Sequence, residues 1–156
     1  MNTETTAAPP RWQRRKDARP SEITQAALQL FIQKGFAATK LDEVAKQAGV
    51  TKGTLYLYFA SKEELFKAAV RDTVVPSILL AEQVVEDSTL SAKELLRCLV
   101  AEWVRLIEDS PANGLSKLVV AEAGNFPDLA HFYLDEVVYR VRRVFSAVRE
   151  VRQEVS

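Results

Sequence analysis

Apolar residues recur at helical spacing along most of this chain. Between Ser21 and Gly35 they stand three or four positions apart, so that one helical face carries Ile23, Ala26, Ala27, Leu30 and Phe31. The same spacing returns between Ser91 and Asp109, and again from Pro127 to the end of the chain. No run of alternating apolar and polar residues is long enough to indicate a β-strand. The sequence therefore predicts an all-α fold.

The segment after Gly35 predicts three short helices in close succession. Residues that cap or end helices divide it, because side-chain oxygens satisfy the first N–H groups of a helix and glycine or proline ends one. In chain order these are Thr39 with Asp42, Gly49, Thr51, Ser61 with Glu64, and Pro76. Together with the helix that begins at Ser21, they predict a compact unit of four helices.

Residues 40–59 meet the packing demands of a helix-turn-helix. Ala45 is small where the second helix must cross, and Gly49 allows the left-handed backbone of the turn. Val50, Leu55 and Phe59 are placed to anchor the second helix inward. The residues left facing outward at its start are Thr51, Lys52, Gly53, Thr54 and Tyr56. Hydroxyls, a cation and bare backbone at a helix N-terminus suit phosphates and base edges in the major groove of DNA.

The formal net charge of zero hides a strong asymmetry. Residues 1–71 contain twelve Lys or Arg against seven Asp or Glu, whereas residues 72–156 contain nine against fourteen. A basic N-terminal part attracts a polyanion, and residues 1–16 predict a flexible basic arm. The sequence has neither an apolar run that would span a bilayer nor a secretory signal pattern, so we expect no membrane association and a cytoplasmic protein.

Two adjoining stretches, ITQAALQLFIQKGFAATK and LDEVAKQAGVTKGTLYLYFASKEELFKAAV, closely resemble the DNA-binding head of the TetR family of bacterial transcriptional regulators. The resemblance covers residues 17–77, and the later AEAGNFPDLAHFY is similar to a segment in the regulatory region of some members. It implies a homodimer that binds a pseudo-palindromic double-stranded DNA operator, usually as a repressor. It also implies release of the operator when a small-molecule effector enters the helical ligand-binding and dimerisation region, residues 78–156.

The same resemblance implies roles for individual residues. Thr51, Lys52 and Thr54 occupy base-facing positions, and Gly53 lies between them. Tyr58 and Phe59 are better interpreted as a hydrophobic plug, and Lys62, beside two glutamates, as either a DNA contact or a solvated cation. The positions that resemble phosphate contacts of the family are Thr39, Lys40, Tyr56 and Lys62.

The C-terminal half supplies candidates for a ligand pocket and for a subunit interface. The aromatic residues that could line a pocket, or equally belong to the core, are Trp103, Phe126, Phe132 and Tyr133. A seam of valines on the last predicted helix indicates a dimer interface, since we expect the chain itself to leave it uncovered: Val141, Val144, Val148, Val151 and Val155. Members of the family continue through further helices after this point, so we expect either a shortened member or an incomplete chain.

Two other classes of function remain as alternatives. An enzyme is disfavoured, because the sequence has a single histidine, His131, and neither a phosphate-binding glycine loop, a nucleophile elbow nor clustered metal ligands. We therefore expect no catalysis, cofactor or metal. A helical interaction protein, which modulates a full-length regulator without productive DNA binding, also fits the pattern. The one cysteine, Cys98, is expected in the core.

Overall fold

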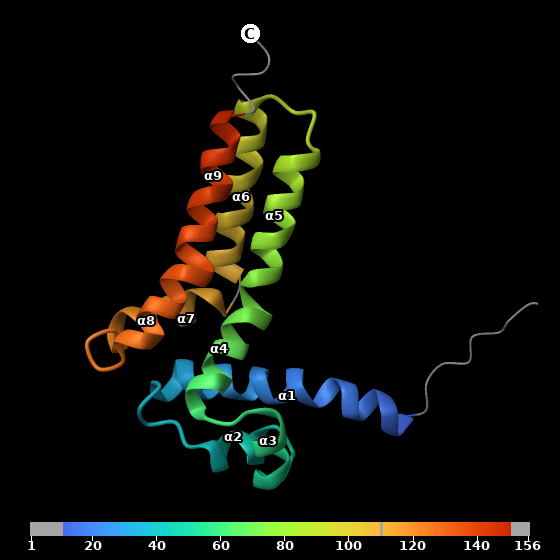
Figure 1. Cartoon of the computed structure of the whole chain (residues 1–156), viewed down its shortest axis with the longest axis vertical. Helices are drawn as coiled ribbons and strands as arrows, with labels where there is room; N and C mark the ends of the chain where they lie inside the picture. Colours follow the sequence, from blue (N-terminus) through green and yellow to red (C-terminus); the bar gives the residue numbers. More distant parts are fainter. Residues whose placement is uncertain (1–10, 110, 151–156) are drawn as a thin grey trace, which may run out of the picture.

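The computed structural model describes residues 11–109 and 111–150, which form helices and turns without a strand. The helices are α1 (Arg11–Lys34), α2 (Leu41–Gln47), α3 (Lys52–Tyr58), α4 (Lys62–Thr73), α5 (Val75–Asp87), α6 (Ala92–Asp109), α7 (Ala112–Glu122), α8 (Pro127–Tyr133) and α9 (Tyr139–Glu150), with a π-helical turn at Leu134–Val138 before α9. Figure 1 shows α1, α2 and α3 as a head at one end and α5, α6 and α9 as an elongated body at the other, with α7 and α8 at the end of the body that faces the head. The predicted all-α fold is confirmed.

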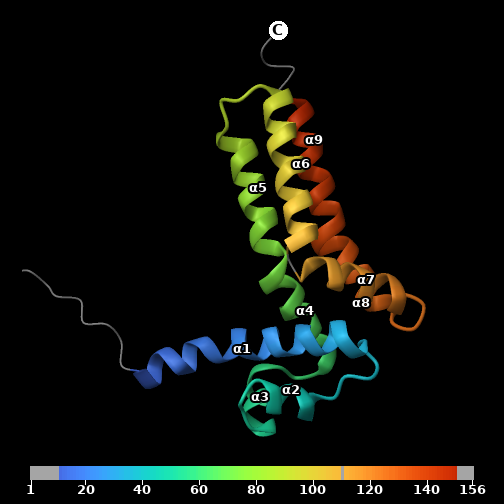
Figure 2. The ribbon, with the colours of Figure 1, turned by 180° about the vertical axis from the view of Figure 1, so that it is seen from behind.

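Three phenylalanines form the centre of the head. Phe31 on α1, Phe36 in the following loop and Phe66 on α4 are each at most 1% exposed. Their ring centroids lie 5.4 to 5.8 Å apart, in tilted or edge-to-face arrangements that aromatic rings favour. Because α4 contributes one ring to this core and then runs toward the body, it links the two parts (Figure 2).

Two glycines end head helices as the sequence predicts. Gly35 follows α1 with a φ of 87°, and Gly49 follows α2 with a φ of 69°. A Cβ atom built at Gly49 would meet nothing within 4 Å. The need for glycine at this turn therefore comes from the backbone conformation and not from lack of space.

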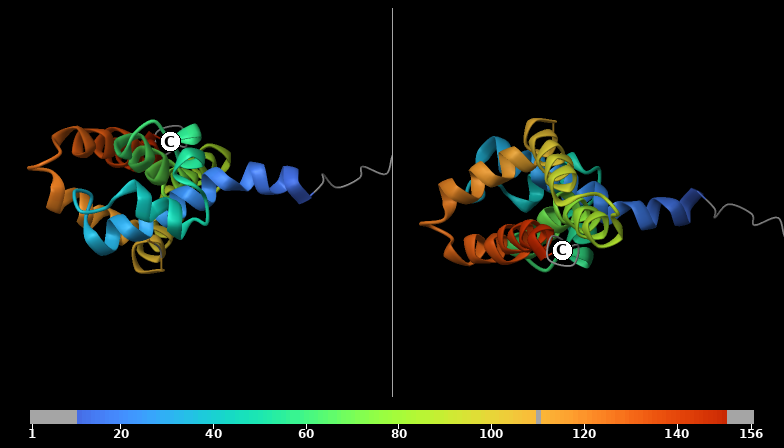
Figure 3. Two further views of the ribbon diagram at one scale, coloured as in Figure 1. Left: turned by 90° about the horizontal axis from the view of Figure 1, so that it is seen from below. Right: turned by 90° about the horizontal axis from the view of Figure 1, so that it is seen from above.

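The start of α1 differs from the prediction of a flexible arm over residues 1–16. The helix already begins at Arg11, and residues 1–10 lie outside the described part. The segment between Arg11 and Pro20 lacks apolar periodicity but contains mainly good helix formers, so the missing periodicity led to a wrong prediction. Seen from below, this end of α1 extends beyond the rest of the head (Figure 3).

A smaller correction concerns the start of α2. The N-cap residue is Lys40, not Thr39, and its backbone N–H donates to the Glu43 carboxylate at 3.4 Å. At α4 the prediction holds, since the Ser61 hydroxyl accepts a hydrogen bond from the Glu64 N–H at 3.1 Å.

The body covers most of the valine seam that the sequence assigned to a partner. Val144 and Val148 on α9 are 5% and 4% exposed, and Val141 is half-buried against the same core. The expectation that they stay uncovered is therefore wrong, because α5, a helix that the sequence analysis did not single out, packs along α9 together with α6. The other two members of the seam, Val151 and Val155, lie outside the described residues.

Part of the apolar surface of the body remains exposed on α5, where Leu79 and Leu80 are 51% and 62% exposed, and a longer row lies on α6. Five large apolar side chains there are 42% to 48% exposed: Leu96, Val100, Trp103, Val104 and Ile107. Cys98 is also exposed, which corrects its expected place in the core. On the inward face of α6, Leu95 and Leu99 are buried.

The turn at Gly49 gives a first prediction. Gly49→Ala should lower the free energy of unfolding by about 1 to 2 kcal/mol, because alanine resists the left-handed conformation. Gly124→Ala is the matched control, since Gly124 also has open space around its Cα but no positive φ. Urea denaturation measures both variants, and equal small effects would show that the turn does not depend on glycine.

Candidate nucleic-acid interface

The exposed end of α3 is fixed by its own cap. The Thr51 hydroxyl accepts a hydrogen bond from the Thr54 N–H at 3.1 Å, and the two hydroxyl oxygens lie 2.9 Å apart. On the opposite side, Leu55 is completely buried and holds α3 against the head. The helix therefore presents its first turn to solvent in a defined orientation.

The outward face of α3 carries most of the residues that the sequence predicts there. Thr51, Lys52 and Gly53 are exposed, Thr54 is half-buried, and Tyr56 is 46% exposed. Leu57, which the sequence analysis did not select, is 83% exposed. The signal for it was available, since Leu55 already occupies the inward position and a neighbouring leucine two residues later must face elsewhere on a helix.

An ion pair joins α3 to α2 across this face. The Lys52 ammonium lies 2.8 Å from the Asp42 carboxylate, which accepts its hydrogen bond and raises the pKa of Lys52 above its ordinary value. Both side chains are more than half exposed, so the pair adds little stability. Lys52 therefore stays charged and is free to exchange Asp42 for another anion.

A second ion pair ties α2 to α1. The Lys34 ammonium donates to the Glu43 carboxylate at 2.8 Å. This hydrogen bond, with that from the Lys40 backbone N–H, lowers the pKa of Glu43. Lys40 itself is exposed at the start of α2, as a DNA contact requires.

Thr39 and Lys62, which the family resemblance implies as phosphate contacts, instead form hydrogen bonds within the head. Thr39 is 1% exposed, and its hydroxyl donates to the Gly35 carbonyl at 2.8 Å. The Lys62 ammonium donates to the carbonyl oxygens of Phe36, Ala37 and Thr39 at 2.8, 3.2 and 3.1 Å. An ammonium group has three donors, so all of them are used within the head. Neither residue offers a free polar group to DNA.

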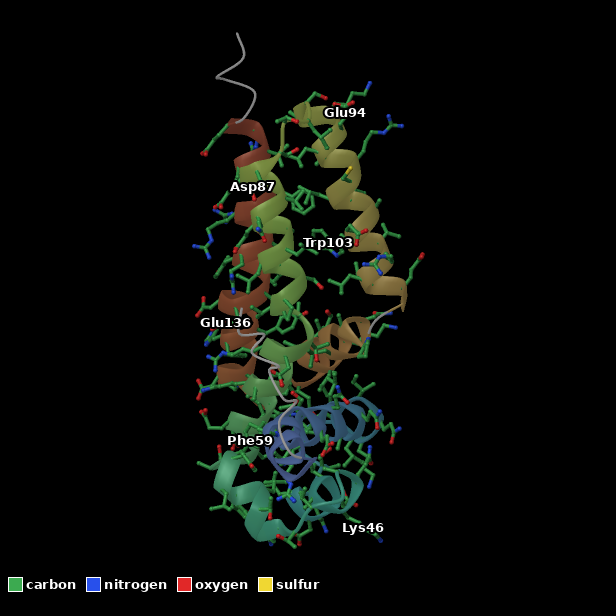
Figure 4. All side chains as sticks on the ribbon, turned by 90° about the vertical axis from the view of Figure 1, so that its right-hand side faces the viewer. Lys46, Phe59, Asp87, Glu94, Trp103 and Glu136 are labelled. Atoms are coloured by element: carbon green, nitrogen blue, oxygen red, sulfur yellow. The ribbon has the colours of Figure 1, made fainter. Side chains whose placement is uncertain are left out.

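Phe59 and Tyr58 are half-buried against the core, in agreement with the predicted plug. Figure 4 places Phe59 where α3 leads into α4, and Lys46 at the outer end of the head.

The four aromatic candidates for a ligand pocket have separate surroundings. Trp103 packs on Phe145 of α9 at 5.4 Å between centroids, and Figure 4 shows it on the inner side of α6. Phe126 packs on Phe36 at 4.8 Å. Phe132 faces the cations of α4, and the Tyr133 hydroxyl lies 2.7 Å from that of Ser116. Phe126, Phe132 and Tyr133 thus lie where the body meets the head. Of the four, only Trp103 lies among the long helices of the body, away from the head.

A cleft that the sequence analysis did not foresee lies at the junction of α1 and α4. Its volume is about 430 Å³, and its lining residues include Thr24, Gln25, Ile32, Asp72 and Pro111. The Thr24 hydroxyl donates to the Asp72 carboxylate at 2.7 Å within it.

Comparison with known proteins agrees with the geometry of the head. Residues 23–69 match the family described as bacterial regulatory proteins, tetR family. The head of this chain is therefore a TetR-type head. A crystal structure of a protein assigned to this family, from Mesorhizobium loti, superposes on 90% of the chain and 70% of its own length with a TM-score of 0.74 and 25% identity.

Two further proteins show that the likeness extends beyond the head. The fatty acid metabolism regulator of Bacillus subtilis is 30% identical over 94 residues, which are 59% of this chain and 48% of that protein. The flavonoid-responsive regulator FrrA matches with a TM-score of 0.65 and 27% identity, covering 88% of this chain and 70% of its own. The chain spans about half the length of the curated relative. Within the described residues, no helix is long and apolar enough to cross a membrane.

The contacts of Lys62 give a second prediction. Lys62→Met should lower the free energy of unfolding by about 1.5 to 3 kcal/mol, because it leaves carbonyl groups of the α1–α2 loop without a charged donor. Lys52→Met serves as the control: the Lys52 side chain is more than half exposed, and its loss should leave the free energy of unfolding nearly unchanged. Chemical denaturation measures both variants. An unchanged free energy of unfolding in Lys62→Met would show that Lys62 does not stabilise the α1–α2 loop.

Proposed function

We propose that this protein is a DNA-binding transcriptional regulator, a repressor that binds a pseudo-palindromic operator as a dimer and releases it when a small ligand binds. Residues 17–77 are the DNA-binding unit and residues 78–156 the region for effector and partner. The observation that carries the proposal is the capped first turn of α3, which presents Thr51, Lys52 and Gly53 to solvent while Leu55 anchors the helix.

The chemistry of this surface matches duplex DNA. The Lys52 ammonium and the free N–H groups at the start of α3 suit phosphate oxygens or a guanine edge. Tyr56 offers a phenol to the backbone, and the exposed Leu57 suits the methyl group of thymine. Lys40, at the start of α2, adds a positive charge beside them. The excess of basic residues in the first 71 positions supports the same partner.

The effector and dimer parts of the proposal rest on the body. Since Val144 and Val148 are already buried in the chain, a second copy has to use other apolar surface, and the exposed residues of α6 supply it. The relatives named for fatty acid metabolism and for a flavonoid response support an apolar effector. Trp103, packed on Phe145 but 43% exposed, is the aromatic candidate best placed to meet such a ligand in the body.

The DNA-binding proposal is tested on duplex sites selected by the wild-type protein from a random-sequence library. Lys52→Ala should weaken binding to a selected site by about 1 to 3 kcal/mol, because it removes a base or phosphate contact. Lys117→Ala is the control, since Lys117 is an exposed lysine on α7 in the body and should leave affinity unchanged.

Fluorescence anisotropy at several salt concentrations measures these affinities. Wild-type affinity should fall steeply as salt rises, because DNA binding releases counterions. A wild-type protein without salt-dependent affinity for any duplex would favour the alternative, an interaction module that acts on another regulator. Equal losses in both lysine variants would mean that charge alone, and not α3, accounts for binding.

A further inference from the structure

The backbone N–H, the carbonyl and the ring of Phe36 each contact another part of the molecule. Its backbone N–H donates to the Glu122 carboxylate at 3.0 Å, and its carbonyl accepts from Lys62 at 2.8 Å. Its ring packs on Phe31 and Phe66 in the head and on Phe126 at 4.8 Å. The Lys62 ammonium also lies 4.6 Å from the centre of this ring. Phe36 is therefore a fixed point between the two parts of the molecule.

Two of these contacts come from the body. Glu122 is the last residue of α7, and Phe126 precedes α8, so both belong to the turn between those helices. Glu122 is half-buried, and its Oε1 atom would lie only 3.0 Å from a Cβ atom at Gly35. The turn thus approaches the end of α1 so closely that a larger residue at Gly35 would press on the carboxylate, in addition to the backbone strain at its positive φ.

The contacts continue from Phe36 to the DNA-reading helices. Lys62 binds the carbonyls of Phe36 and Thr39 at once, and Thr39 immediately precedes the N-cap of α2. From α2, the Asp42–Lys52 pair and the turn at Gly49 lead directly to α3. An unbroken series of contacts therefore joins the α7–α8 turn, through Phe36 and Lys62, to the start of α2.

We propose that Glu122 is a positioning residue through which the helical body sets the placement of the α1–α2 loop and, through it, of α2 and α3. Its carboxylate accepts a backbone N–H of the head, a bond that charge strengthens. A second polar contact, from the Arg71 guanidinium to the Glu136 carboxylate at 3.4 Å, joins α4 to the body through side chains. Arg71 is more than half exposed, and this contact does not reach the loop. The consequence for DNA binding rests on the function proposed above.

The test compares Glu122→Ala with Glu122→Gln, which keeps a carbonyl oxygen for the Phe36 N–H. Amide hydrogen exchange and amide chemical shifts in the folded full chain report on the loop without DNA. We expect Glu122→Ala to speed exchange at Phe36 by about tenfold or more and to shift the amide signals of Thr39 and Lys40. In Glu122→Gln, the exchange rate at Phe36 and the amide signals of Thr39 and Lys40 should stay close to those of wild type. Exchange at the core residue Leu65 should be as in wild type in both variants.

Operator affinity supplies the second readout. With a selected duplex, Glu122→Ala should bind several-fold more weakly and Glu122→Gln about as well as wild type, whereas loss of fold alone would also raise exchange at Leu65. Unchanged exchange at Phe36, changes that stop before α2, or unchanged affinity despite a changed loop would each overturn the proposal. If wild-type protein binds no duplex, the proposed function fails by itself, and the exchange and chemical-shift data still decide whether Glu122 positions the loop.

Discussion

The three hydrogen bonds from the Lys62 ammonium to the α1–α2 loop are the interaction on which the head depends. The loop has to reverse the chain after a long helix, and Lys62 supplies a charged donor to three of its carbonyl groups beside a core of phenylalanine rings. Because Lys62 lies at the start of α4, it also fixes that helix relative to α2. A cation that resembles a DNA contact in sequence thus serves to build the surface that we propose for DNA binding.

The same loop also joins the head to the body, two parts with opposite net charge. The head carries the excess of basic residues and the proposed recognition surface on α3. The body is acidic and has a row of exposed apolar residues on α6. They meet where the Phe36 ring packs between Phe31 and Phe66 of the head and Phe126 of the body. An apolar contact of this kind, combined with the bond to Glu122, resists independent motion of the head more than surface ion pairs do.

The sequence was most informative where local chemistry decides structure. Gly35, Gly49, Thr51 and Ser61 mark helix ends through backbone conformation or a cap, and each does so in the structure. It was least informative where distant segments meet. That α5 would bury Val144 and Val148, or that Glu122 would reach Phe36 across 86 positions, depends on packing that no local pattern encodes. Lys62 was misassigned for the same reason, since its partners lie more than twenty positions earlier.

The central claim is that the first turn of α3 is the surface that meets DNA. Titration of the isotope-labelled protein with a selected duplex, followed by amide chemical shifts, tests it most directly. The largest changes should fall on residues 51–57 and on Lys40, with small changes over α6 and the outer face of α7. Changes centred on α6, or saturable binding that leaves residues 51–57 unaffected, would contradict the account.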